Sequence, residues 1–401
     1  MTARHVVFIN NHPNDCVICK STAMQPFARF SNVPISGHFC RTIQEKVPER
    51  DLVFDYCPQC AFVSQRLSNI SINYSNVARS TARQIPGYTK KIIGDLIANS
   101  SSGLLVEVGC NDGTFLNLLR QEGFFRLLGV EPSRKLAAQV RQQGHEVFSS
   151  LLEEESSREI VRKYGKAQSV VCRHTLEHVP HPLDFLRAVR LLLDKGGLLM
   201  LEVPSLRPII DQMHVHEMWD EHVSYFLPDN LVSLLIKAGF LIERVSVKPH
   251  LKMENIVVLA RAGVDCSTEL PNMRREVKAC RDFSTRWQNV RLQMLELVRG
   301  SPRPLVFMGA SHPQSNLLNF SGISSWVDCA IDDDPSKAGL WLPLQGSKVP
   351  IWPMAKLKEA VTGGTLLLTG FGYPRWMKEA SEVAKGHAAA TLDILNLLSA
   401  P

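Results

Sequence analysis

The sequence lacks the features that mark membrane, secreted and nucleic-acid-binding chains. No apolar run reaches the roughly eighteen residues that a membrane span needs, and the apolar stretch near the start, Val6 to Ile9, is much shorter than a signal-peptide core. Lys and Arg number 45 against 39 Asp and Glu, and they form no basic block of the kind that binds nucleic acid. We therefore expect a cytoplasmic protein that binds neither membranes nor nucleic acid.

The composition is that of an ordinary globular chain. Hydrophobic residues make up 45% of the 401 positions, which is enough for two or three domains with apolar cores. Ten cysteines are present. In the reducing interior of a cell, cysteines serve more often as thiols or metal ligands than as disulfides, so their placement is informative.

Four cysteines form two pairs with the same two-residue gap, Cys16 with Cys19 and Cys57 with Cys60. This spacing lets both thiolates of a tight turn face one tetrahedral ion, and four thiolates leave no open position for water. The pairs therefore predict a structural Zn²⁺ site. Two unrelated reduced pairs or a redox dithiol are the alternatives, and no thioredoxin-like pattern supports the second. The rival ligands between the pairs are His38 and Cys40.

A strand, a glycine turn and a later acid indicate a nucleoside cofactor. Residues 104–109 read as a buried strand and 114–120 as the helix after it, with Asn111 and Asp112 in the turn between them. Glu131 ends the next strand, at the spacing where a carboxylate can take both hydroxyls of a ribose. Asp112 would repel a pyrophosphate, whereas S-adenosylmethionine has no phosphate and carries an ammonium and a sulfonium. The pattern therefore favours S-adenosylmethionine over a dinucleotide.

Strands and helices continue to alternate after this motif. Residues 168–172 and 198–204 read as buried strands, with a helix at 183–193 between them. This alternation predicts an α/β fold with a doubly wound, Rossmann-like parallel sheet that binds its ligands at the carboxyl ends of the strands. The last part of the chain repeats the pattern and predicts a second Rossmann-like sheet, with strands at 304–309, 326–332 and 364–370.

Four segments resemble the class I methyltransferases that use S-adenosylmethionine, and more narrowly the sugar C-methyltransferase family. That family places a zinc-binding domain before the methyltransferase domain and a Rossmann-like domain after it. The cysteine pairs match the first of these domains, so the resemblance covers nearly the whole chain. The four segments are 107–113, 129–133, 173–180 and 221–226, and the matches to the last domain lie at 309–311, 316–319, 332–339 and 350–351.

The resemblance implies a division of the chain into four parts. Between the two sheets, basic residues at helical spacing among apolar ones fit an amphipathic connector better than a nucleic-acid-binding face. The expected parts are a zinc-binding domain at 1–75, the methyltransferase domain at 76–265, the helical connector at 266–300 and the C-terminal Rossmann-like domain at 301–401.

The resemblance also implies which residues hold the cofactor. Acids and glycines of the first turn and the acid of the second strand would bind it, and His174 with its neighbours would flank the adenosyl group. The expected cofactor-binding residues are Glu107, Gly109, Asn111, Asp112, Gly113, Glu131, Pro132, Arg173 and His174.

The family's catalytic segment reads Tyr-x-Glu-His followed by Ser-Tyr-Phe, and its His is taken as the general base. Here that residue is His222, after Glu221, and Trp219 replaces the Tyr and is expected to line the acceptor site. His can take a proton from a carbon beside a carbonyl because its ordinary pKa lies near operating pH. Glu221 or another nearby acid could orient the ring, and Tyr225 could donate to an enolate oxygen. The alternatives are a solvated helix face or a metal site made by His214, His216 and His222.

Other residues are expected to line the acceptor site. Glu177 and His178 lie near the end of a predicted strand, although such residues more often only make local hydrogen bonds. Ser311, His312 and Asn316 open a predicted helix, where an anion or a hydroxyl-rich ligand could bind, or where the domain could simply wall the cleft.

The sequence departs from the family where the acceptor should sit. Residues 251–255 replace a Gly-Gly-Ser segment, and Pro313-Gln314 replaces a Lys-Gly pair. The expected function is therefore C-methylation of a small molecule beside a carbonyl, with a nucleotide-linked keto-sugar or another biosynthetic intermediate as acceptor. The alternatives are an N- or O-methyltransferase of a different metabolite and a zinc-ribbon interaction protein with a vestigial cofactor fold. Both a monomer and a dimer are compatible with the sequence.

Overall fold

The chain divides into two compact units, each built from three segments. The first unit is Met1–Gln25, Tyr56–Leu206 and Glu221–Val277, and the second is Pro26–Asp55, Arg207–Asp220 and Lys278–Pro401. The computed structural model describes residues 15–35, 37–66, 87–100, 103–250, 253–263, 272–368, 374–388 and 390–394. Outside the described residues lie the predicted boundaries at 75/76 and 265/266, Cys266, residues 251–252 and the end of the predicted strand at 369–370.

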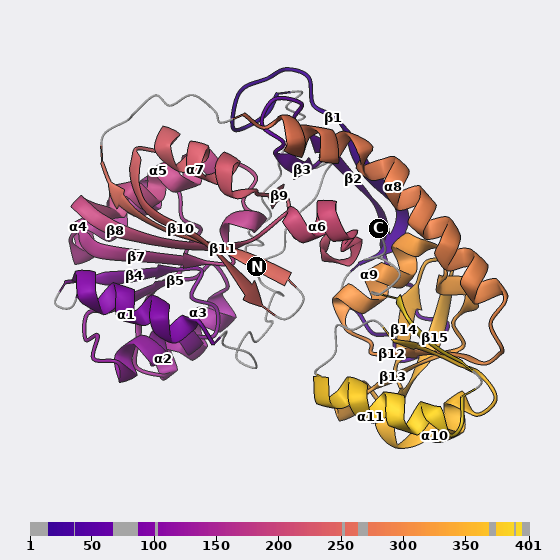
Figure 1. Cartoon of the computed structure of the whole chain (residues 1–401). Coiled ribbons are helices and arrows are strands. Elements are labelled where there is room, and N and C mark those ends of the chain that lie inside the picture. The colour runs from indigo at the N-terminus through magenta and orange to yellow at the C-terminus, as the bar shows by residue number, and fades with distance from the viewer. Residues whose placement is uncertain are drawn as a thin grey trace. The chain divides into compact units, whose positions relative to one another are not determined.

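The first unit is built on a mixed sheet of seven strands within the described residues, in the order β10-β11-β8-β7-β4-β5-β6 (Figure 1). β8, β7, β4, β5 and β6 are parallel; β11 runs antiparallel to β8, and the edge strand β10 runs antiparallel to β11. All four side chains of β4 are buried, as expected for a strand covered on both faces. The strands are β4 Leu105–Val108, β5 Leu127–Val130, β6 Glu146–Phe148, β7 Ala167–Arg173, β8 Leu193–Pro204, β10 Phe240–His250 and β11 Met253–Ala262.

Helices cover both faces of this sheet. Leu96, Phe115 and Val140, on α1, α2 and α3, share one apolar cluster with one face, and Ile160, Leu186 and similar residues of α4, α5 and α7 share another. Figure 1 shows the two groups of helices on opposite sides of the strands. The predicted doubly wound α/β sheet is thereby confirmed. The helices are α1 Thr89–Ser100, α2 Thr114–Gln121, α3 Arg134–Gln142, α4 Glu154–Tyr164, α5 Pro182–Leu192 and α7 Pro228–Lys237.

The two cysteine pairs belong to the core of the first unit. Their buried side chains lie in the same apolar cluster as strands β4, β7 and β8. Helix α7 holds them in place: Asn230 Nδ2 donates to the carbonyl of Cys60 at 3.2 Å, and Lys237 Nζ donates to that of Ile18 at 2.8 Å. Strand β3 (Val63–Gln65), just after the second pair, is antiparallel to β9 (Ser224–Tyr225).

The second unit contains the second predicted sheet. Within the described part of the chain its six strands have the order β14-β15-β13-β12-β16-β17, parallel except for β14. The predicted strand at 326–332 begins only at Cys329, because Ser324–Trp326 forms a 3₁₀ turn. The strands are β12 Leu305–Met308, β13 Cys329–Asp332, β14 Trp341–Leu344, β15 Ser347–Pro353, β16 Thr365–Leu368 and β17 Ala390–Asp393, and the helices are α9 His312–Ser321, α10 Leu357–Val361 and α11 Pro374–Lys385.

A β-hairpin and a long helix complete the second unit. β1 (Gln25–Pro34) pairs with β2 (Glu49–Tyr56), and α8 (Arg274–Arg299) is the helix expected as a connector. Phe27 of β1 stacks on Phe283 of α8 with ring centroids 4.1 Å apart. Arg286 of α8 donates to the carbonyls of Ile210 and Asp211, in the last turn of the short helix α6 (Arg207–Gln212). In the described ranges, no helix is long and apolar enough to cross a membrane.

Candidate active site and metal site

The turn after β4 has a backbone that few residues can adopt. Gly109, Asn111 and Gly113 have φ values of 77°, 48° and 80°, in the left-handed region. A Cβ atom at Gly109 would lie 2.3 Å from Oγ1 of Thr175, the residue that follows His174. Glycine is therefore required at 109 both for its φ and for the close approach of the Thr175 side chain.

Acids surround this turn, as the sequence predicts. The Glu131 carboxylate accepts hydrogen bonds from the backbone N–H groups of Asn111 at 3.0 Å and Ser133 at 2.8 Å, which ties the turn to the end of β5. Asp112 accepts from the N–H of Thr114 at 3.1 Å, at the start of α2. These contacts place three expected cofactor residues at the carboxyl ends of neighbouring parallel strands.

Glu107 lies within β4 and is 4% exposed. Its Oε2 has no hydrogen-bond partner among the described residues. Burial raises the pKa of Glu107 to about 8, with the Arg173 guanidinium acting against this and the acids Asp112 and Glu131 adding to it. An acidic turn with one unpaired carboxylate oxygen suits a ligand that carries an ammonium, a sulfonium and ribose hydroxyls. The residues present therefore fit S-adenosylmethionine.

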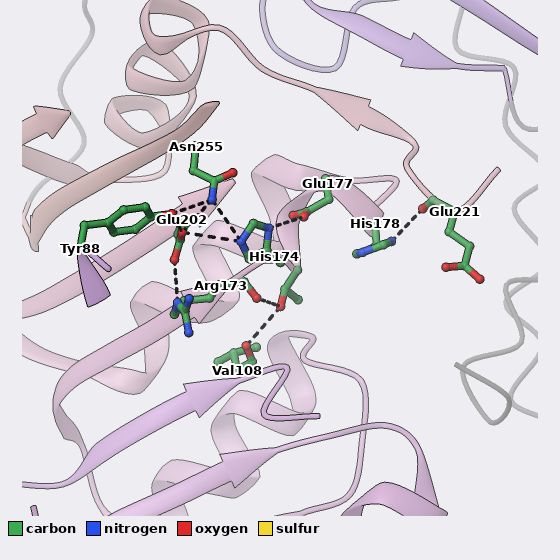
Figure 2. Close-up of polar contacts among 10 residues, drawn as sticks. Tyr88, Val108, Arg173, His174, Glu177, His178, Glu202, Glu221 and Asn255 are labelled. Atoms are coloured by element: carbon green, nitrogen blue, oxygen red, sulfur yellow. Dashed lines mark hydrogen bonds and ion pairs between the residues drawn. The ribbon is translucent and has the colours of Figure 1, made fainter. Parts of the chain in front are cut away.

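A buried polar network lies beside this turn (Figure 2). Arg173 Nε donates to Oε2 of Glu202 at 2.6 Å, and Glu202 is fully buried at the end of β8. Tyr88 and Asn255 donate to the other oxygen, Oε1, from 2.5 and 3.0 Å. Arg173 also lies over the Phe115 ring, 4.6 Å from its centroid. Arg173 was expected to hold the cofactor, and here its Nε is engaged by Glu202.

His174 is held between two carboxylates. Its Nδ1 lies 3.4 Å from Glu177 Oε1, and its Nε2 lies 3.6 Å from Glu202 Oε1. Burial by itself would lower the pKa of His174, yet the two carboxylates together raise it to about 9. The residue has a φ of 46°, so its backbone is also strained. An imidazolium is therefore fixed at the end of β7 near neutral pH.

The expected catalytic residues of the first unit lie together. His222 is 6% exposed, and its ring centroid lies 4.8 Å from that of His178 and 6.2 Å from that of Tyr225. One ligand atom each from Glu177, His178 and His222 lies within 4.8 Å of the other two. The Glu221 carbonyl is 2.9 Å from Nδ1 of His178, and Figure 2 shows the Glu221 carboxylate pointing away from that ring.

Four other expected acceptor residues belong to the second unit. The Trp219 and His312 rings lie 4.4 Å apart, and Asn316 Nδ2 donates to the backbone carbonyl of Met218 at 3.2 Å. The same Asn316 nitrogen lies 3.2 Å from Nε2 of His312. Ser311 is the N-cap residue of α9, which confirms the predicted helix start.

His214 and His216 do not form a solvated helix face. They are 2% and 0% exposed and lie in the second unit, around the 3₁₀ turn Val215–Glu217. The solvated alternative for these two residues is therefore wrong. Within the described residues, His222 is grouped with Glu177 and His178 rather than with these histidines.

The two cysteine pairs have the same local backbone. The N–H of Lys20 donates to the carbonyl of Cys16 at 2.9 Å, and that of Ala61 donates to Cys57 at 3.0 Å. Both residues have a positive φ, 63° and 53°. Each pair is thus a tight knuckle of one geometry, repeated in two places.

The knuckles bring four sulfur atoms together. Cys16 and Cys60 Sγ are 3.5 Å apart, and Cys19 and Cys57 Sγ are 3.4 Å apart. These distances are far longer than a disulfide bond. Four thiolates around one zinc ion, with Zn–S bonds of about 2.3 Å, would have sulfurs about 3.8 Å apart. The donor set and spacing therefore fit a closed tetrahedral zinc site.

Two family models match the chain. Residues 81–245 match a methyltransferase domain, and residues 266–382 match a C-methyltransferase C-terminal domain. The chain is an S-adenosylmethionine-dependent methyltransferase. The methyltransferase is 27% identical over 377 residues to the C-methyltransferase NovU of Streptomyces niveus, covering 88% of this chain and 89% of that protein. It is also 25% identical over 200 residues to the ubiquinone biosynthesis O-methyltransferase of Aeromonas salmonicida (strain A449), covering 45% of this chain and 82% of that protein.

Solved structures with a similar chain trace include other methyltransferases. An S-adenosylmethionine-dependent methyltransferase from Mesorhizobium loti has 14% identity and a TM-score of 0.35, covering 43% of this chain and 96% of its own. The magnesium protoporphyrin IX methyltransferase ChlM from Synechocystis PCC 6803 has 17% identity and a TM-score of 0.35, covering 49% of this chain and all of its own.

Three members of the buried network, Glu202, Tyr88 and Asn255, were not predicted as site residues, and Asn255 was noted only as part of the altered segment 251–255. Glu202 ends a strand that the sequence does predict, and an acid at that position of a buried strand was the available signal. Tyr88 lies just before α1, and no motif marks it. Its place in the network depends on packing between segments far apart in sequence.

Proposed function

We propose that the methyltransferase methylates a small molecule at a carbon next to a carbonyl, with His222 as the general base. The observation that carries the proposal is the burial of His222 beside His178 and Tyr225, in the unit that holds the cofactor turn. Similarity to a C-methyltransferase along most of both chains supports carbon as the methylated atom. A nucleotide-linked keto-sugar is one acceptor of the required type.

S-adenosylmethionine, when bound, supplies a methyl group that is already electrophilic. Glu107, Asp112 and Glu131 would hold it through its cationic and hydroxyl groups, and Gly109 and Gly113 would let the backbone approach. The protein must therefore generate a carbon nucleophile, hold it near the methyl group and exclude water from it.

His222 would take the proton of the C–H bond on one ring nitrogen. Tyr225 is 5% exposed and would donate its hydroxyl to the oxygen on which negative charge develops. Burial of both side chains keeps water from competing for that charge.

We also propose that Cys16, Cys19, Cys57 and Cys60 hold a structural zinc ion. The repeated knuckle and the sulfur spacing support this assignment. Four thiolates would fill the coordination sphere, so the ion would stabilise the fold and take no part in the reaction.

The test combines an isotope label with one substitution. S-adenosylmethionine carrying a ¹³C-methyl group is supplied with candidate keto acceptors, and NMR identifies the atom that gains the label. A new ¹³C–C bond beside the carbonyl is expected, whereas a label on oxygen or nitrogen would reject carbon methylation. The relative that is an O-methyltransferase makes this comparison worthwhile.

The base assignment is tested by His222→Ala, which should lower kcat by at least about a hundredfold and leave cofactor affinity by calorimetry nearly unchanged. His181→Ala is the matched control, because His181 is an exposed histidine at the start of α5 and should retain full turnover. Normal turnover by His222→Ala would reject His222 as the base.

A further inference from the structure

Glu177, His178 and His222 form a cluster with the composition of a metal site. Each offers one ligand atom, and these atoms lie within 4.8 Å of one another. Ligands of one ion at about 2.1 Å lie about 3 to 4 Å apart, so a contraction of about 1 Å would bring the three onto a common ion. Two imidazoles and one carboxylate leave further positions open on the ion.

The tautomer of His178 leaves the right nitrogen for a metal. Its Nδ1 is 2.9 Å from the backbone carbonyl of Glu221, and a carbonyl can only accept (Figure 2). In the neutral ring Nδ1 therefore carries the hydrogen, and Nε2 has the lone pair. Metal-binding histidines characteristically donate their second ring N–H to a carbonyl or carboxylate in this way.

Glu177 supplies a second, independent indication. It is 2% exposed, and neither of its carboxylate oxygens accepts a hydrogen bond from the residues that the structure describes. Its charged neighbour His174 lies at 3.4 Å. A buried carboxylate without hydrogen bonds is costly, and a divalent cation would offset that cost.

A second cluster of mixed ligands among the described residues lacks this feature. His38, Cys40 and Glu45 are also close enough for one ion. However, Glu45 already accepts from His38 at 3.0 Å and from the N–H of Arg41 at 2.8 Å. Its carboxylate is satisfied, so it serves as the control.

We propose that Glu177, His178 and His222 bind a divalent transition-metal ion of the Zn²⁺ or Co²⁺ type, and that this ion inhibits methyl transfer by occupying the ring nitrogen of His222. Imidazole and carboxylate ligands suit these ions. The claim that the cluster binds a metal depends only on the geometry of the three residues. The claim that the metal inhibits methyl transfer also rests on the proposed role of His222 as base. A lone pair shared with a metal cannot accept a proton from the acceptor.

Cobalt titration tests whether the cluster binds a metal. The full-length protein is first loaded with one zinc ion per chain, which the four thiolates should bind in preference to imidazole and carboxylate ligands, and Co²⁺ is then added while the visible spectrum is recorded. One further cobalt per chain should bind with weak d–d bands and no thiolate charge-transfer band. Glu177→Gln and His178→Ala should each weaken this binding by more than about tenfold, whereas Glu45→Gln should leave it unchanged.

Circular dichroism confirms that each variant is folded, and His178→Ala, at a half-buried position, serves where Glu177→Gln does not fold. Two results would contradict the proposed metal site: no d–d bands when cobalt is added to the zinc-loaded wild type, or bands in both folded variants that are as strong as those of the wild type. Either result leaves the base assignment to the labelling and His222→Ala experiments.

Turnover measured in the same titration tests whether the metal inhibits methyl transfer. Loss of methyl transfer with the same midpoint as the d–d bands is the expected result. If the d–d bands reach full strength while the rate of methyl transfer stays unchanged, the metal site is supported. Both the inhibition by the metal and the role of His222 as base are then rejected.

Discussion

Glu107 carries a buried carboxyl group in the middle of a strand. Because burial disfavours its charged form, its pKa rises to about 8, above the 4.5 of an exposed glutamate. The native state therefore holds a proton that the unfolded state has lost, between about pH 4.5 and pH 8. Stability from this group is present below that window and is lost as the pH rises through it.

Glu107→Gln should remove this pH dependence, because glutamine keeps the shape and carries no charge. Between pH 6 and pH 9 the ligand-free wild type should lose about 2 to 3 kcal/mol relative to the variant. Urea denaturation of both proteins at the two pH values measures the difference, and the other titrating groups cancel in the comparison. An equal difference at both pH values would show that the carboxyl is already ionised in the native state.

At the level of elements, the strands that sequence predicts best are those buried on both faces. β4 and the second half of β8, residues 198–203, are nearly continuous apolar runs, each interrupted by one buried glutamate, because helices cover both sides of the parallel sheet. The antiparallel strands β10 and β11 were not predicted. β10 exposes Leu241, Val245 and Val247, so neither a continuous run nor a clean alternation of apolar and polar residues marks it.

The site shows the same limit. The cysteine spacing predicts knuckles, and their sulfurs do meet, because a two-residue gap fixes the local turn. The hairpin β1–β2 lies between the two knuckles in the sequence, and no local sequence pattern predicted it. Likewise Glu177 and His222 lie far apart in sequence. Their segments are joined by hydrogen bonds that no local pattern marks, such as those from Val223 N–H to the Glu177 carbonyl at 2.8 Å and from Ser224 Oγ to the Val179 carbonyl at 3.1 Å.

Gly109, in the turn after β4, can be compared with Gly123, which follows helix α2. Gly109 and Gly123 both have a positive φ, 77° and 94°, but a Cβ at Gly123 would meet no atom within 4 Å. Gly123→Ala should therefore cost only backbone strain, about 1 to 2 kcal/mol, and keep cofactor affinity. Gly109→Ala should cost more and weaken S-adenosylmethionine binding at least tenfold, because Thr175 must move. Urea denaturation and calorimetry measure both, and equal results for the two variants would contradict the close packing.

At the scale of the whole molecule, each unit has an apolar core of its own. One cluster of the first unit includes Cys16, Cys57 and Cys60 together with the parallel strands, while Cys329 lies in a cluster of the second unit. Separate cores can unfold separately. Because the knuckle cysteines pack among sheet residues, a change at the proposed zinc site is expected to act on the entire first unit.

Differential scanning calorimetry should therefore resolve two transitions, and S-adenosylmethionine identifies that of the first unit. At one hundred times its dissociation constant the ligand adds about 2.7 kcal/mol to whichever unit binds it. Cys19→Ser should remove the zinc that elemental analysis detects in the wild type. It should also lower the midpoint temperature of the ligand-sensitive transition alone, because metal binding to the knuckles is coupled to folding of their core. Cys329→Ala, at a buried position of β13, should retain zinc and lower only the other transition. A Cys19→Ser protein with an unshifted ligand-sensitive transition would mean that the knuckles hold no stabilising ion.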